Sequence, residues 1–347
     1  MREQRIEWLD WLKGMGIMLV IIGHSFRDEM RVVSTAADFI YSLIYVFHMP
    51  LFFAIAGYLF HLNYKKNIRK PVLEFSVGRM KAYLRPFFSY TILIYAFFYL
   101  SNLIPPIRRM TENTTLQIIP ITKYFLLGVS CNNPYAFHLW YLLILFLISV
   151  YAFILGKIEK KIGLGEGVLI LLFSFVLWNF RVLFAADNIM LIKMLLKFPI
   201  FFAVGMYYDK IDRDRWYLPV SVISWTYCCL YVCGFLSRST GLLWYIKNLL
   251  LLISTIVIVD DLFTFSKLYC NTNILNKVGK NSLYYFLLHQ PFCCGLLGTV
   301  LYGKFGCSIL ITCLVCTLAS ILFPSIVLWI KSRFKPINKL FVLLFGV

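Results

Sequence analysis

Two histidines, His24 and His48, lie inside the first two apolar segments of this chain. An ionisable side chain inside a bilayer costs free energy, so an intramembrane histidine is by default a hypothesis for a functional site. Histidine is also the side chain whose ordinary pKa best suits proton exchange near neutral pH. The pair therefore predicts chemistry that is carried out within a membrane.

The overall composition predicts that the whole chain is built for a bilayer. Of its 347 residues, 61% are hydrophobic and 14% are charged, whereas soluble domains are about 45–50% apolar and about 25% charged. A spanning helix needs roughly 20 apolar residues. We therefore expect an all-α integral membrane protein with about ten transmembrane helices, in a single membrane domain over residues 1–347. The expected segments are 11–27, 38–61, 86–104, 136–156, 164–184, 188–208, 217–236, 243–262, 281–302 and 306–330.

The basic residues predict the orientation of these segments. The net charge is +18, and the Lys and Arg residues lie mainly in the loops on the side that holds the N-terminus, in roughly a two-to-one excess. This distribution predicts that both termini are cytoplasmic. It also favours membrane lipid over nucleic acid as the partner of the basic surface. Most of the ten cysteines lie in apolar runs and are interpreted as small hydrophobes, so no metal site is expected.

Four of the five histidines are expected between the middle of the membrane and its outer surface. At 1.5 Å per residue, His24 lies roughly 20 Å from the inner face and His48 roughly 15 Å below the outer face. His138 opens the fourth segment at its outer end, and His289 lies near the middle of the ninth. A proline follows two residues after both His48 and His289, and helices broken in this way are typical of cavities. For each histidine alone, a hydrogen-bonded packing role is the alternative.

A basic cluster stands just before the third segment and consists of Arg79, Lys81 and Arg85. One interpretation is ordinary anchoring by positive charge on the inner face. The other is a seat for an anionic cytosolic ligand, because the arginine fork matches phosphate oxygens.

Several motifs, taken in order along the chain, resemble the acyltransferase-3 family, and in particular the fucose 4-O-acetylase-like sugar O-acetyltransferases. The motifs are Asp10-Trp-Leu-Lys13-Gly14, Gly23-His24, Phe47-His48-Met49-Pro50, His138-Leu-Trp140, Phe201-Phe202-Ala-Val-Gly205 and His289-Gln-Pro291. Two features differ from many members. Lys13 stands where they carry arginine, and the basic pair before the third helix has another spacing.

The resemblance implies a multi-pass enzyme of the bacterial plasma membrane. Such an enzyme moves an acyl group, usually acetyl from cytosolic acetyl-CoA, onto a cell-surface glycan or a lipid-linked sugar. His24 is then expected to be the general base for the acceptor hydroxyl, and His48 to orient the substrate or share the proton transfer. The basic cluster is expected to hold the phosphates of coenzyme A. The residues expected to contact substrate are Asp10, Lys13, His138, Trp140 and His289.

Two other functions stay open at this stage. A membrane transporter of a small polar solute would favour inverted repeats and matching broken helices, and no such repeat is visible. A flippase or scaffold partner in polysaccharide assembly would use the histidines only for packing. The identity of the acceptor and the choice between acetyl and succinyl are also open.

Overall fold

The computed structural model describes residues 6–104, 120–133, 136–184, 189–211, 213, 217–235, 240–270 and 273–346. Within these ranges the chain is helical and contains no strand, which confirms the all-α prediction.

The first half of the chain is a series of helices that ends with the long helix α9. Its elements are α1 (Glu7–Ser25), α2 (Asp28–Val33), α3 (Thr35–Leu62), α4 (Tyr64–Arg69), α5 (Val72–Arg79), η1 (Met80–Leu84), α6 (Arg85–Asn102), α8 (Ile121–Val129), η2 (Phe137–Leu139) and α9 (Trp140–Ile162).

The second half contains more short and interrupted helices. Its elements are α10 (Val168–Phe184), α11 (Met190–Lys197), α12 (Pro199–Met206), η3 (Tyr208–Lys210), α13 (Tyr217–Val232), α14 (Gly241–Tyr269), α15 (Asn273–Lys280), α16 (Ser282–Leu288), η4 (His289–Leu296), η5 (Thr299–Lys304), α17 (Ile309–Arg333) and α18 (Lys335–Phe345).

Several of these helices are suited to cross a bilayer, so the chain is a membrane protein. In the described part of the chain, five helical stretches are long and apolar enough to span. They are Thr35–Leu62, Phe137–Ile162, Gly241–Tyr269, Ser282–Lys304 and Ile309–Arg333. The total of about ten spans and the cytoplasmic position of both termini stay predictions.

One expected segment, 188–208, is not a single helix. The structure divides it into α11 and α12 at Phe198 and Pro199. Proline lacks a backbone N–H and suits the first position of a new helix better than a helix interior. Each piece has eight residues and is about 12 Å long, so neither alone crosses a hydrocarbon core of about 30 Å.

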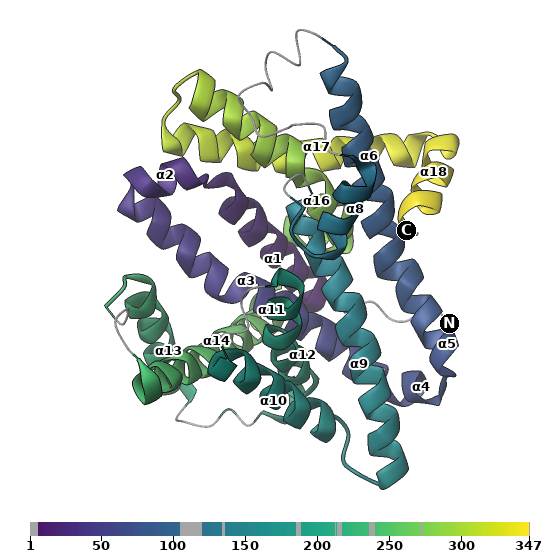
Figure 1. Ribbon diagram of the computed structural model, residues 1–347, viewed down its shortest axis with the longest axis vertical. Coiled ribbons are helices and arrows are strands. Elements are labelled where there is room, and N and C mark those ends of the chain that lie inside the picture. Colours follow the sequence, from purple (N-terminus) through teal and green to yellow (C-terminus); the bar gives the residue numbers. More distant parts are fainter. Residues whose placement is uncertain are drawn as a thin grey trace.

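Helices α1 and α3 run from the left side of the molecule into its middle (Figure 1), and α1 packs against α15, α3 and α14. The crossing of α1 and α15 depends on two glycines. A Cβ atom on Gly14 would collide with the backbone carbonyl of Leu275, and one on Gly279 with the carbonyl of Asp10. Backbones approach this closely because glycine has no side chain on the contacting side, which is a common way of packing helices in membranes.

The crossing of α3 and α12 also depends on two glycines. A Cβ atom on Gly57 would collide with the carbonyl of Phe202, and one on Gly205 with the carbonyl of Ala54. The two glycine crossings together fix α1 and α3, the helices that carry His24 and His48.

A buried carboxylate fixes the end of α9 where α4 and α10 meet it. Glu159 is fully buried, and its carboxylate accepts hydrogen bonds from the Tyr64 hydroxyl at 2.6 Å and from the backbone N–H groups of Gly167 at 3.0 Å and Leu169 at 2.6 Å. The first N–H groups of a helix lack partners inside that helix, so Glu159 caps α10 while Tyr64 ties α4 to α9.

We predict that Gly57→Ala destabilises the protein, because the added methyl group meets backbone, which cannot rotate away. The expected cost is about 1–3 kcal/mol, seen as a lower midpoint of thermal unfolding in detergent. Gly78→Ala is the matched control, because nothing lies within 4 Å of its added Cβ. Equal midpoints for Gly57→Ala and Gly78→Ala would contradict the proposed role of the glycine crossing.

Candidate active site

Four histidines from α1, α3, η2 and η4 come together around one place in the structure. The ring centroids of His24 and His289 are 5.3 Å apart, and those of His289 and His138 are 5.4 Å apart. His48 joins the group through Tyr45, whose ring lies 4.6 Å from His48 and 6.0 Å from His24. We call these four imidazoles and Tyr45 the histidine cluster. The sequence predicted the histidines as site residues one by one, and the fold places them side by side.

Backbone carbonyls fix which nitrogen carries the proton in two of these rings. Nδ1 of His48 lies 2.8 Å from the carbonyl oxygen of Ile44, and Nδ1 of His289 lies 3.1 Å from that of Tyr285. A carbonyl only accepts, so Nδ1–H is the donor in both rings. In a neutral imidazole, Nε2 then presents a lone pair. Both rings are therefore set up to accept a proton or a hydrogen bond at Nε2.

Tyr45 was not singled out from the sequence. Its hydroxyl lies 3.3 Å from Nδ1 of His24, and its ring stacks on Tyr41 with a centroid distance of 3.9 Å. The guanidinium of Arg31 lies 3.7 Å above the Tyr41 ring. Residues three apart on a helix are neighbours, so the position of Tyr45 one turn before His48 was a signal that could have found it.

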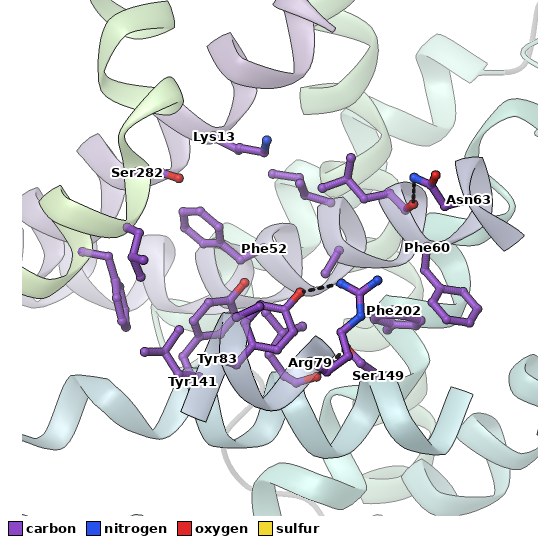
Figure 2. A pocket seen from close by; sticks show the side chains of 18 of the residues that line it. Lys13, Phe52, Phe60, Asn63, Arg79, Tyr83, Tyr141, Ser149, Phe202 and Ser282 are labelled. Atoms are coloured by element: carbon purple, nitrogen blue, oxygen red, sulfur yellow. Dashed lines mark hydrogen bonds between the residues drawn. The ribbon is translucent and has the colours of Figure 1, made fainter. Parts of the chain in front are cut away.

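A cavity of about 490 Å³ lies along α3, between α1 on one side and η1 and α9 on the other. Figure 2 shows Phe52 in its middle and, around it, Lys13, Ser282, Tyr83, Tyr141, Arg79 and Ser149. Its lining on this helix runs from Met49 to Asn63, a distance of about 20 Å at 1.5 Å per residue. The cavity is thus long enough to hold an extended ligand.

The two ends of the cavity differ in chemistry. At the Met49 end the walls are aromatic and include Phe52, Tyr141 and Phe286. At the Asn63 end and along α1 the lining contains four cationic side chains, and none of the described lining residues is Asp or Glu. The cations are Lys13, Lys66, Lys70 and Arg79. An excess of positive charge at one end of an apolar cavity suits an anionic ligand with a long apolar or neutral arm.

Local contacts hold two of these cations in place. The Nζ of Lys13 is 3.4 Å from a carboxylate oxygen of Asp10, which is buried. The guanidinium of Arg79 lies 3.4 Å from the Tyr83 hydroxyl and 5.0 Å above the Phe75 ring. Asp10 therefore acts behind the cavity wall and positions Lys13.

The structure separates the three members of the basic cluster that was expected to act together. Arg79 lines the cavity, whereas Lys81 and Arg85 are not among its lining residues. Lys81 is exposed, and the guanidinium of Arg85 lies close to Gly346 after α18. Two residues correspond to about half a turn of helix, so Lys81 faces away from Arg79, and the π-helical element η1 separates Arg85 from Arg79.

Trp140 is also placed away from the cavity. Its ring is buried and stacks on Phe198 with a centroid distance of 5.3 Å and on Phe53 at 6.3 Å. Its neighbour Tyr141 faces the cavity instead. Trp140 therefore packs α9 against α3 and the start of α12, and so helps to position Tyr141.

The cavity and the histidine cluster lie end to end. Met49 follows His48 directly, and Phe286 precedes His289 by three residues, and both line the cavity. A ligand held by its anionic end among the cations would point its other end toward imidazoles whose Nε2 atoms accept protons. This arrangement suits general base catalysis on a group at the end of an anionic carrier.

Comparison with known proteins identifies the family of this chain. No curated protein and no solved structure matches this chain. The family model described as an acyltransferase domain, acyltransferase-3, matches residues 6–330. That match covers nearly the whole chain and confirms the predicted acyltransferase-3 family, while the fucose 4-O-acetylase-like branch stays a prediction. The chain thus belongs to the acyltransferase-3 family of membrane acyltransferases.

Proposed function

We propose that this protein is an integral O-acyltransferase of the plasma membrane. It moves an acetyl or similar acyl group from acyl-CoA to a sugar hydroxyl of a cell-surface glycan or lipid-linked precursor. The observation that carries the proposal is the cavity whose cationic end leads to an aromatic end beside four histidines. Membership of the acyltransferase family supports this reaction over transport.

The cationic end of the cavity suits the donor. Coenzyme A carries its phosphates at one end and its thioester at the other, joined by a long arm. Arg79 and Lys66 offer charge-assisted hydrogen bonds to phosphate oxygens. The arm then lies along α3, past Phe52, and brings the acyl group to the aromatic end. Lys81 and Arg85, which face away, take no part in this binding.

His24 serves as the general base in the proposed reaction. With Nδ1–H donated to the Tyr45 oxygen, Nε2 takes the proton from the acceptor hydroxyl as that oxygen attacks the thioester carbonyl. A carbon–oxygen bond forms, the carbon–sulfur bond breaks, and the coenzyme leaves as a thiolate that regains the proton. The products are the sugar ester and free coenzyme A. His48, with its own Nε2 lone pair, supports the same transfer.

We predict that His24→Ala lowers transfer by at least about 100-fold, because a general base contributes about 10²–10⁴-fold. The measurement is transfer of label from radiolabelled acetyl-CoA to the glycan fraction of membranes that contain the protein. His61→Ala is the control, because His61 lies outside the histidine cluster, where its Nδ1 is 2.7 Å from a carboxylate oxygen of Glu166. Near-normal transfer by His24→Ala would show that the base is another residue.

We also predict that Arg79→Ala weakens acetyl-CoA binding by about 10-fold or more, since a hydrogen bond to a charged group contributes about 1.5–3 kcal/mol. Binding is measured with tritiated acetyl-CoA on purified protein in detergent. Lys81→Ala, two residues away and outside the cavity, should bind within about twofold of wild type. Equal losses for the two variants would contradict the assignment of the donor site.

A further inference from the structure

The donor cavity and the histidine cluster are neighbours, but none of the four histidines of the cluster is among the residues that line the cavity. Phe286 belongs to both places. It lines the cavity, and its ring centroid lies 5.4 Å from His138 and 6.2 Å from His289. The ring of Phe286 therefore stands between the space for the donor and the imidazoles.

The neighbours of Phe286 form one wall with it. The Tyr141 ring lies 5.6 Å from it in a T-shaped contact, and the Phe52 ring lies 5.9 Å from Tyr141. Phe286 lies in the last turn of α16, and the helical path is interrupted at Gln290, whose φ of −122° and ψ of 145° are extended. The element that carries this ring thus ends within one turn beyond it.

Polar atoms without partners lie behind this wall. The Nε2 atoms of His138 and His289 are buried, and the described part of the chain gives neither a hydrogen-bond partner. A buried polar atom without a partner costs about 1–3 kcal/mol and calls for an explanation such as a ligand. The side of the wall that faces the donor is aromatic, whereas the side behind it holds these two buried ring nitrogens. Phe286 separates these two environments.

We propose that Phe286 is the partition between the donor cavity and the histidine cluster, and that its ring restricts the passage to short acyl groups. This inference rests on the proposed function. An acetyl group is small enough to pass beside the ring, whereas a longer acyl chain meets it. Removal of the ring joins the donor cavity to the space beside the histidines and gives longer acyl chains room. Phe286 is thus a specificity-determining residue for the acyl donor.

The experiment compares acyl-CoA binding by purified full-length protein in detergent. Acetyl-, butyryl- and hexanoyl-CoA compete with tritiated acetyl-CoA for wild type, Phe286→Ala and Phe292→Ala. We expect Phe286→Ala to raise the affinity for hexanoyl-CoA relative to acetyl-CoA by at least about 10-fold, because one methylene group in a pocket alters selectivity by about 10–200-fold. Phe286→Leu should give a smaller rise, and it covers the case in which the alanine variant does not fold.

Phe292→Ala is the matched control for loss of a phenyl ring. Phe292 follows Phe286 by six residues, contacts Phe97 and Phe323, and is not among the cavity lining. The affinities of Phe292→Ala for butyryl- and hexanoyl-CoA, each relative to acetyl-CoA, should stay within about threefold of the wild-type ratios. Unchanged ratios in both Phe286 variants, or an equal rise in Phe292→Ala, would overturn the partition and leave the proposed function standing. Failure of every acyl-CoA to bind wild type would overturn both.

Discussion

The site depends on close contact between helix backbones at four glycines. Gly14 and Gly279 let α1 touch α15, and Gly57 and Gly205 let α3 touch α12. Because lipid tails are as apolar as the side chains, helices in a bilayer gain from close packing and not from burial alone. α1 carries His24, α3 carries His48, and α15 leads into α16 and His289. A wider crossing of α1 and α15 would move His24 and His289 apart.

In the proposed function, binding and chemistry lie at opposite ends of the cavity. Positive charge gathers where α4 and α5 meet the end of α3, and the proton-accepting nitrogens lie about 20 Å away along that helix. Interactions with a remote part of a substrate can hold its reacting group in place. The long arm of a coenzyme suits this separation, because the proposed reaction needs the anion to be bound at one end while an uncharged acyl group reaches the imidazoles. Glu159 and Tyr64 stabilise the cationic end by fixing α4 against α9.

The sequence is most informative where one residue type carries a high cost in a membrane. Each of the four histidines was singled out from its apolar surroundings, and the fold places all four together. The sequence is less informative where the direction of a side chain decides what it contacts. Arg79, Lys81 and Arg85 are close in sequence but face different sides, and Trp140 packs inward while Tyr141 faces the cavity.

The sequence by itself determined that this is a helical membrane protein of the acyltransferase-3 family, because apolar runs and spaced motifs are local properties. Only the tertiary structure brought Tyr45 to His24, divided 188–208 at Pro199, and placed Phe286 between cavity and histidines. The physical reason is that a helix in a membrane is apolar on all sides. Its hydrophobic pattern therefore does not show which face meets another helix, and that choice is made by glycine contacts, breaks in helices and ring packing.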